Sequence, residues 1–325
     1  MAPTDGLATA PCDDLDLLTE AARLAAAAAP SALVTVVASS GSTPRHPPAK
    51  MIVGADGTAR GTIGGGRLEA EISKAAAAVA SGEAPPFRLR RATRDFGMCC
   101  GGEVDIWIEP LDSGRAEALA EVTRRLARRL PTALVTMLAT PGGKQALAEH
   151  PCLEARRPQL AGDCFVEPVL PRDRLLLFGS GHVARALAAL AADTGFAVVV
   201  CDDDELLSPE RFPAALRVDS LDVAFVLREI GPFGRGDHAI IATRDHELDQ
   251  AVLEQLLPRR ELASLGMLGS LRKRERLRLR VESRGIDAAN WERLRCPVGI
   301  AIGAETPEEI AVSIVAELVR IRRGA

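Results

Sequence analysis

The chain has 325 residues, of which 47% are hydrophobic, so it is long enough for two domains that each bury a core. A formal net charge of −4 disfavours a polyanionic partner, and an aromatic content of 3% without tyrosine disfavours the stacking platforms that bind single-stranded nucleic acid. No apolar run approaches the length of about 18 residues that a membrane-spanning helix needs, so we expect neither nucleic acid nor a membrane as partner.

The amino-terminal residues and the cysteines indicate a cellular compartment. The chain begins with acidic residues and has no basic segment ahead of an apolar one, so we expect no secretion signal. The seven cysteines are odd in number and irregularly spaced. Without a secretion signal, this pattern predicts reduced thiols and a cytoplasmic location.

The first loop that suits an anionic ligand follows a predicted helix over 14–29 and a buried strand over 32–38. The loop 41–45 has two hydroxyl side chains and ends in a cation, which favours an anion as ligand. An ordinary turn explains the same residues. The candidate binding residues here are Ser42, Thr43 and Arg45.

A second loop of this kind follows a strand over 50–53 and a hairpin turn at Asp56 and Gly57. Three consecutive glycines open a helix over 66–80. Such a helix start presents free N–H groups to an anion such as phosphate, and close packing of the helix on a sheet is the alternative. The candidate residues are Gly64, Gly65 and Gly66.

Two adjacent thiols lie in a third loop, directly before an alternating strand over 104–109. Cys99 and Cys100 are followed by Gly101 and Gly102, and glycine allows the sharp, open backbone that a ligand can approach. Thiolates attack electrophiles, carry sulfur and bind soft metals, so both cysteines are candidate metal ligands. The alternative is that they are small buried packing residues.

Proline and glycine are dense between 141 and 174, which is typical of a linker or crossover. We therefore predict an amino-terminal domain over 1–150, a linker over 151–173 and a second domain over 174–325.

The second domain begins with a dinucleotide-binding pattern. A buried strand at 175–178 is followed by Gly-Ser-Gly-His-Val-Ala, then a helix, then a strand at 197–201 that ends in an acid about 21 residues after the second glycine. This order predicts a Rossmann fold, whereas dinucleotide binding in its crevice stays open because folds outlive their ligands. The candidate residues are Gly179, Gly181, His182 and Asp202.

The remaining segments continue the alternation of strand and helix. Strands are predicted at 239–242 and 262–265, and a final helix begins with a capping box at Thr306. The basic run 271–276 is either a solvated helix face or a contact for an anion or a partner. The predicted fold class is α/β, with a C-terminal Rossmann-like parallel sheet and a separate N-terminal α/β domain with a mixed sheet.

In this order, the motifs resemble those of the XdhC/CoxI family, the accessory proteins of xanthine dehydrogenase and related molybdenum hydroxylases. The resemblance covers about residues 15 to 322. The segments that carry it are Gly41–Arg45, Gly61–Gly66, Cys99–Gly102, Phe178–Val183, Asp245-His246, Gly266–Arg274 and Cys296–Gly299.

The resemblance implies a protein that binds the molybdenum cofactor, protects it while sulfur replaces an oxo ligand, and delivers it to the apo-hydroxylase. A cysteine desulfurase supplies the sulfur in that family. Carried over, Cys99 and Cys100 lie at the cofactor site, and the glycine-rich loops hold the pterin phosphate or a nucleotide part. The chain departs from the expected pattern at Met98, where we expect a more polar residue, and at Ala184, which the dinucleotide fingerprint permits in place of glycine.

Two other functions stay open. One is a nicotinamide-dependent oxidoreductase with Cys99 and Cys100 as redox thiols, although no obvious acid–base residue stands beside them. The other is a scaffold that bridges desulfurase and hydroxylase without touching the cofactor. A cofactor-binding chaperone that forms a homodimer is the favoured interpretation.

Overall fold

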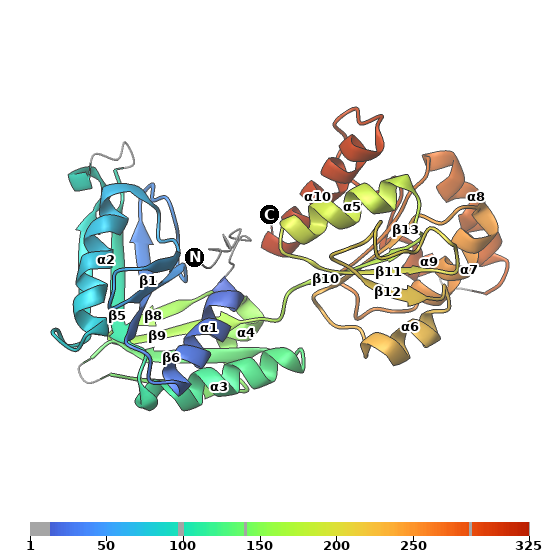
Figure 1. Ribbon diagram of the computed structural model, residues 1–325. Helices are drawn as coiled ribbons and strands as arrows, with labels where there is room; N and C mark the ends of the chain where they lie inside the picture. Colours follow the sequence, from blue (N-terminus) through green and yellow to red (C-terminus); the bar gives the residue numbers. More distant parts are fainter. Residues whose placement is uncertain (1–13, 97–100, 140–141, 286–287, 325) are drawn as a thin grey trace, which may run out of the picture. The chain divides into compact units, whose positions relative to one another are not determined.

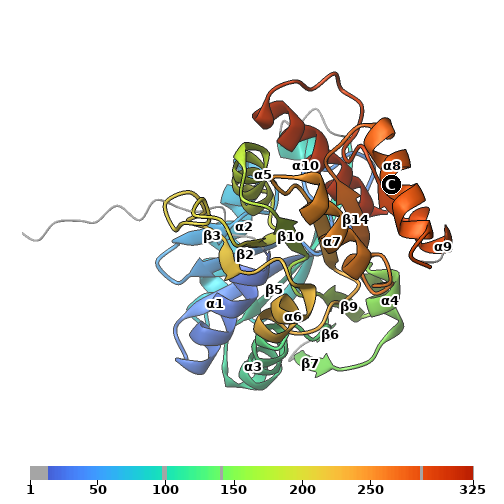
Figure 2. The ribbon, with the colours of Figure 1, turned by 90° about the vertical axis from the view of Figure 1, so that its right-hand side faces the viewer.

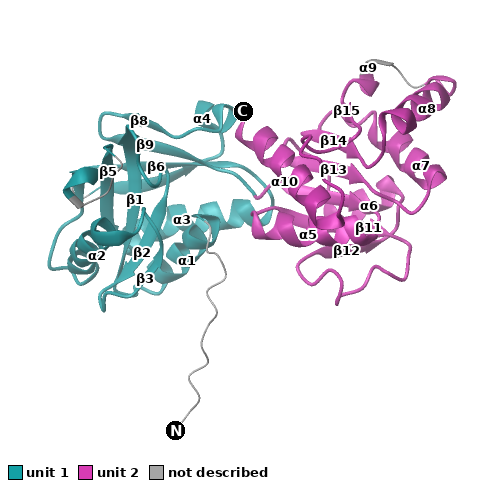
Figure 3. Cartoon of the chain, turned by 90° about the horizontal axis from the view of Figure 1, so that it is seen from above, with its two compact units in different colours: residues 1–171 teal, residues 172–325 magenta. Residues whose placement is uncertain are grey.

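The computed structural model describes residues 14–96, 101–139, 142–285 and 288–324 (Figure 1). The chain forms two compact units, residues 1–171 and 172–325, which Figure 3 shows in different colours. Among the described residues, no helix combines the length and the apolar character that crossing a membrane requires.

Unit 1 contains two antiparallel sheets. The five-stranded sheet has the order β3-β2-β1-β5-β4, and the four-stranded sheet has the order β7-β6-β9-β8. The strands of the first sheet are β1 (Ser31–Ser40), β2 (Lys50–Gly54), β3 (Ala59–Gly61), β4 (Phe87–Ala92) and β5 (Glu103–Pro110). Those of the second are β6 (Thr132–Met137), β7 (Gly143–Leu147), β8 (Gln159–Ala161) and β9 (Cys164–Val169).

Alternate residues of a strand point to opposite faces of its sheet, so apolar strands need helices or another sheet on both faces. The helices are α1 (Asp14–Ala26), α2 (Gly66–Ala80), η1 (Thr93–Phe96), α3 (Ser113–Ala127) and α4 (Pro151–Ala155). Val34 and Val36 of β1 pack with the apolar side of α2, which Leu68 and Ile72 form. Leu33, which precedes Val34 and points to the other face, belongs to a different cluster with residues of α1, α3 and β6. The first sheet is therefore buried on both faces, which explains why β1 is an almost continuous apolar run.

Two expectations for this half need correction. The described strand pairs in unit 1 are antiparallel, so two antiparallel sheets replace the expected mixed sheet. The predicted linker 151–173 is wrong for most of its length, because residues up to Val169 form α4, β8 and β9. Its prolines and glycines occupy places that structured segments tolerate: Pro151 is the first residue of α4, and Gly162 has a positive φ of 58° between β8 and β9.

Buried ion pairs join the two sheets of unit 1. Lys50 of β2 pairs with Glu167 of β9, and both side chains are at most 2% exposed. A second pair has the carboxylate on the first sheet and the lysine on the second. Glu109 of β5 pairs with Lys144 of β7 at 2.8 Å, and also with Arg115 of α3 at 2.7 Å. Each sheet thus supplies a buried lysine to a carboxylate of the other.

Unit 2 has a single parallel sheet in the order β12-β11-β10-β13-β14-β15. Its strands are β10 (Arg174–Phe178), β11 (Ala197–Asp202), β12 (Leu216–Asp219), β13 (Asp237–Ile241), β14 (Ser264–Met267) and β15 (Leu294–Arg295). The order runs outward in both directions from β10, so the topological switch point lies between β10 and β13. The expected Rossmann-like parallel sheet is confirmed.

Helices cover both faces of this sheet (Figures 1 and 2). They are α5 (His182–Asp193), α6 (Val223–Ile230), α7 (His246–Leu256), α8 (Leu271–Glu282), α9 (Ala288–Trp291) and α10 (Pro307–Arg323). Leu175 and Leu177 of β10 pack with α5 and α10, whereas Leu176 and Phe178 pack with α6, α7 and α8. This doubly wound arrangement places the loops after the strands at one edge, where ligands of such folds bind.

Candidate functional site

The loop 41–45 and the glycines after the cysteine pair lie against each other in unit 1. A Cβ on Gly102 would lie 2.5 Å from the carbonyl oxygens of Ser40 and Ser42 and 2.7 Å from Cγ2 of Thr43. The Gly102 carbonyl accepts hydrogen bonds from the backbone N–H and the hydroxyl of buried Thr93, both at 2.9 Å. Only glycine fits this position, so the end of the cysteine loop is fixed against residues 40–43.

The glycine-rich loop before α2 joins the same region. Gly64 has a φ of 137°, and a Cβ there would lie 2.6 Å from Cγ of Pro44. The structure therefore brings together three of the four loops that the sequence singled out, including Ser42, Thr43, Gly64, Gly101 and Gly102.

The amides of this glycine-rich loop already have a partner in the chain. Ile63 and Gly65 donate their N–H groups to one carboxylate oxygen of Glu69, at 3.1 and 3.0 Å, and the Thr62 hydroxyl donates to the same oxygen at 2.6 Å. The Gly64 N–H donates to the Thr62 hydroxyl at 3.2 Å. A phosphate at Gly64 and Gly65 would have to displace Glu69, so these glycines serve close packing and the turn itself.

The guanidinium of Arg45 is a partly exposed cation in the loop 41–45. Its guanidinium lies 3.6 Å from the Asp14 carboxylate, and its side chain is 42% exposed. A long, exposed ion pair of this kind contributes little to stability, and its cation can turn toward another anion.

The cysteines themselves, Cys99 and Cys100, lie outside the described residues. Within the described ranges, no group of three or more histidine, cysteine, aspartate or glutamate side chains could hold a metal ion. The assignment of both cysteines as metal ligands thus stays a prediction.

The two glycines of the dinucleotide motif in unit 2 have different surroundings. Gly179 has a φ of 122°, and a Cβ there would overlap the Ala242 carbonyl group, so this glycine is required for packing of the β10 turn against the end of β13. A Cβ on Gly181 would meet no heavy atom of the surrounding residues within 4 Å. His182 is exposed at the first position of α5.

Asp202 occupies the expected place at the end of β11, but its carboxylate is already hydrogen-bonded inside the chain. One oxygen accepts from the N–H and the hydroxyl of Ser180, both at 2.7 Å. The other accepts from the Asp203 N–H at 2.9 Å and from Arg244 at 3.2 Å. With four donors on a buried carboxylate, Asp202 holds the glycine turn and has no free lone pair aimed at a ribose.

Arg244 ties the ends of two strands together across the motif. It follows β13 and lies 2.7 Å from Asp203 at the end of β11, while β10 lies between these strands in the sheet. The hydrogen bond from Arg244 lowers the pKa of Asp203. Sequence reasoning missed this contact, because the two residues follow different strands and a motif shows only the residues of its own segment.

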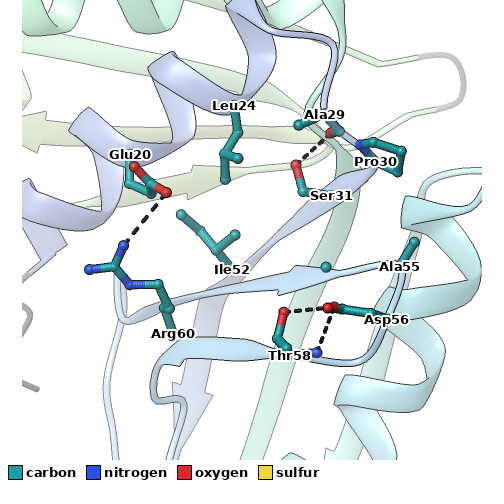
Figure 4. Close-up of a pocket in the computed structure, with 11 residues that line it drawn as sticks. Glu20, Leu24, Ala29, Pro30, Ser31, Ile52, Ala55, Asp56, Thr58 and Arg60 are labelled. Atoms are coloured by element: carbon teal, nitrogen blue, oxygen red, sulfur yellow. Dashed lines mark hydrogen bonds and ion pairs between the residues drawn. The ribbon is translucent and has the colours of Figure 1, made fainter. Parts of the chain in front are cut away.

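A pocket of about 400 Å³ lies elsewhere in unit 1, between α1 and the β2–β3 hairpin (Figure 4). Leu24 and Ile52 line it together with polar side chains that bond to one another. The Glu20 carboxylate lies 3.5 Å from Arg60, and the Asp56 carboxylate accepts from the Thr58 hydroxyl at 2.6 Å. Each of these four side chains thus has a partner at the pocket, although the Arg60 side chain is still 61% exposed.

Comparison with known proteins identifies the family. The model of the XdhC and CoxI family matches residues 24–91, and the model of the XdhC Rossmann domain matches residues 175–318. The chain belongs to the XdhC/CoxI family. These matches cover parts of both units, as the resemblance in the sequence predicted.

Three curated proteins are similar to this XdhC/CoxI chain. The uncharacterized protein YqeB of Escherichia coli is 30% identical over 96% of this chain and 47% of its own length. A protein of Bacillus subtilis that is named as a probable xanthine dehydrogenase subunit is 37% identical over 49% of this chain and 46% of its own. The molybdenum cofactor insertion chaperone PaoD of Escherichia coli is 28% identical over 89% and 83%. The chain thus spans about half the length of the first two.

A solved structure supports the fold over the whole XdhC/CoxI chain. The crystal structure of a protein described as a xanthine dehydrogenase from Bacillus halodurans is 27% identical and superposes with a TM-score of 0.80. The match covers 96% of each chain.

The reactivity of the other cysteines in this XdhC/CoxI chain provides a comparison for Cys99 and Cys100, the predicted metal ligands. Burial raises the pKa of the Cys152, Cys201 and Cys296 thiols. We therefore expect these three to react slowly with iodoacetamide at neutral pH in the native protein, because the thiolate is the reactive form. Peptide mass spectrometry after a short exposure will give the labelled positions.

The expected labelling is confined to the four remaining cysteines: Cys12, Cys99, Cys100 and Cys164. Unfolding in urea before labelling is the control, since it should make all seven react alike. Fast native labelling of Cys201 would contradict the burial argument, and unreactive Cys99 and Cys100 would favour the view that they are packing residues.

Proposed function

We propose that this protein binds the molybdenum cofactor and delivers it to a molybdenum hydroxylase of the xanthine dehydrogenase type. The observation that carries the proposal is the packing of Gly102 against residues 40–43. It fixes the end of the cysteine loop beside the hydroxyl side chains of the loop 41–45 and Arg45. The name of PaoD, a molybdenum cofactor insertion chaperone, supports the same function in a relative.

The residues at this site suit the chemistry of the cofactor. Thiolates are soft ligands and suit a molybdenum–sulfur centre, so Cys99 and Cys100 would hold the metal end. Arg45 offers a charge and Ser42 a hydrogen bond to the phosphate end, whereas the hydroxyl of Thr43 donates to the Arg45 carbonyl within the loop. In the neighbouring glycine-rich loop, the Glu69 carboxylate already accepts the N–H groups that a phosphate would need. We therefore assign the phosphate to the loop 41–45 rather than to Gly64 and Gly65.

Sulfuration and partners form the finer part of the proposal. A thiol loop that binds the cofactor reversibly would hold it while a cysteine desulfurase supplies sulfur, and would release it to the client hydroxylase. The free thiols of Cys152, Cys164, Cys201 and Cys296 agree with a reducing compartment such as the cytoplasm. The homodimer and a dinucleotide in the Rossmann crevice stay predictions.

The test is to replace Cys99 and Cys100 by alanine, singly and together, and to measure molybdenum per chain after purification from molybdenum-replete cells. We expect the double variant to fall to the background level and the co-expressed client hydroxylase to stay under-sulfurated. The reason is that alanine offers no soft donor in place of the lost thiolate. The folding transition should be unchanged.

Cys164→Ala is the matched control, because it removes a partly exposed thiol of the same unit that lies on β9. It should retain molybdenum as the wild type does. Full molybdenum retention and client activity in the double cysteine variant would refute the proposed role of the pair.

A further inference from the structure

His46 is held in one orientation by two hydroxyl groups. Its Nδ1 lies 3.1 Å from Oγ of Ser39 and 3.2 Å from Oγ1 of Thr43. The Thr43 hydroxyl also lies 3.1 Å from the carbonyl oxygen of Arg45, to which it donates. Neither the family resemblance nor the motif analysis singled out this histidine.

Counting protons in this group assigns the tautomer. A hydroxyl has one proton, and the Arg45 carbonyl can only accept, so Thr43 gives its proton to that carbonyl. Toward His46, the Thr43 oxygen then presents a lone pair. The contact is favourable only if Nδ1 bears the imidazole proton and donates it to the hydroxyl oxygens. In the neutral ring, the proton-free nitrogen is therefore Nε2.

The free nitrogen faces away from these bonds. The His46 side chain is exposed, and no described residue lies within hydrogen-bond distance of Nε2. A ring that is anchored through one N–H and presents the other nitrogen is the usual arrangement of a histidine that offers its lone pair to a ligand.

The position of this lone pair is next to the proposed cofactor site. Thr43, which holds the ring, is also the residue whose Cγ2 would lie 2.7 Å from a Cβ on Gly102. The same short loop therefore contacts the end of the cysteine loop and orients His46. This contact is independent of the hydrogen bonds that fix the tautomer.

We propose that His46 is a specificity-determining residue that accepts a hydrogen bond at Nε2 from a pterin ring, with Ser39 and Thr43 as its positioning residues. The proposal rests on the proposed function, since it assigns the part of the cofactor that lies at this loop. A pterin has an amino group and ring N–H groups that donate. A phosphate oxygen only accepts, so an Nε2 that offers its lone pair does not suit the phosphate end.

The first experiment measures the tautomer without any ligand. In protein labelled with ¹⁵N-histidine, the nitrogen chemical shifts at pH 8 should show His46 with a protonated Nδ1 and a proton-free Nε2. Replacement of both anchors, Ser39→Ala with Thr43→Val, should give a mixture of tautomers. A wild-type His46 with the proton on Nε2 would overturn the inference.

The second experiment measures binding of metal-free molybdopterin released from a purified molybdenum enzyme. His46→Phe keeps a ring but removes the acceptor, and we expect its dissociation constant to rise about threefold to tenfold, the usual effect of one lost hydrogen bond. His46→Gln restores an acceptor oxygen and should recover part of the loss. Inorganic phosphate, tested as a competitor, should be equally effective against the wild type and His46→Phe.

These outcomes separate the inference from the function on which it rests. Equal molybdopterin affinity in the wild type and His46→Phe would refute the role of His46 while the cofactor-binding function stands. No molybdopterin binding by the wild type would refute both. A reduced phosphate competition in His46→Phe would show that Nε2 faces the phosphate, which also overturns the assignment.

Discussion

Replacement of Lys50 by methionine is expected to destabilise unit 1 by about 3–5 kcal/mol, the usual cost of leaving one member of a buried ion pair without its partner. The Glu167 carboxylate would remain between the two sheets with an exposed fraction of 2% and no cation to compensate it. The Pro48 carbonyl oxygen, which accepts from the Lys50 ammonium at 2.9 Å, would also lose its donor.

Removal of both charges should recover most of that loss. In Lys50→Met with Glu167→Leu, two apolar side chains of similar volume replace the pair, and such exchanges are often neutral. Trp107 of unit 1 and Trp291 of unit 2 are the two tryptophans of the chain, and both are buried. Urea unfolding followed by fluorescence in a Trp291→Phe background therefore reports unit 1 alone.

The exposed ion pair between Arg91 and Glu71, at 3.0 Å, is the matched control. Glu71→Gln should change the free energy of unfolding by less than about 0.5 kcal/mol, because water screens both charges. If Lys50→Met were as stable as the Glu71→Gln control, the two sheets would not depend on the buried pair.

Local signals in the sequence were sufficient to predict the elements themselves. The helix predicted at 66–80 has these bounds in the structure. The capping box is also confirmed, since the side chains of Thr306 and Glu309 each bond to the backbone N–H at the other's position. Helix termini and apolar periodicity depend on residues close in the chain, which a sequence shows directly.

The segment from 143 to 169 could not be predicted in this way. Proline and glycine usually interrupt regular structure, but an edge strand or a helix start accepts them. The strand β9 lies between β6 and β8, but Pro168 lies beyond the residues 164–166 that pair with β8, so this end of the strand is an edge. It pairs with β6 through residues that are distant in the sequence. The tertiary pairing overrode the local signals.

The candidate site was predictable in its parts but not in its bonding. The sequence identified the loops, because glycine marks close approach, and the structure shows that Gly102 and Gly64 are needed for packing. It could not show that Glu69 fills the glycine-rich loop or that Asp202 is saturated by Ser180, Asp203 and Arg244. These partners are set by the tertiary fold, whereas a motif contains only the residues of one segment.

Substitution of the two glycines of the dinucleotide motif should change the stability of unit 2 by very different amounts. Gly179→Ala is expected to destabilise unit 2 by roughly 3–5 kcal/mol, which combines strain at a φ of 122° with overlap of the new Cβ and the Ala242 carbonyl. Gly181→Val places its side chain in open space at a φ of −66°, so its unfolding free energy should change by less than about 1 kcal/mol.

Fluorescence of Trp291 in a Trp107→Phe background will follow the unfolding of unit 2 alone. Calorimetry on the folded Gly181→Val protein will measure nucleotide binding in the crevice. Any nucleotide that the wild type binds there should lose its affinity, because the valine occupies the space through which a phosphate approaches the start of α5. Undiminished nucleotide affinity in Gly181→Val would place the ligand elsewhere. A Gly179→Ala protein as stable as the wild type would show that the turn after β10 can move away from Ala242, and the close contact of β10 with the end of β13 would then not be a requirement of the fold.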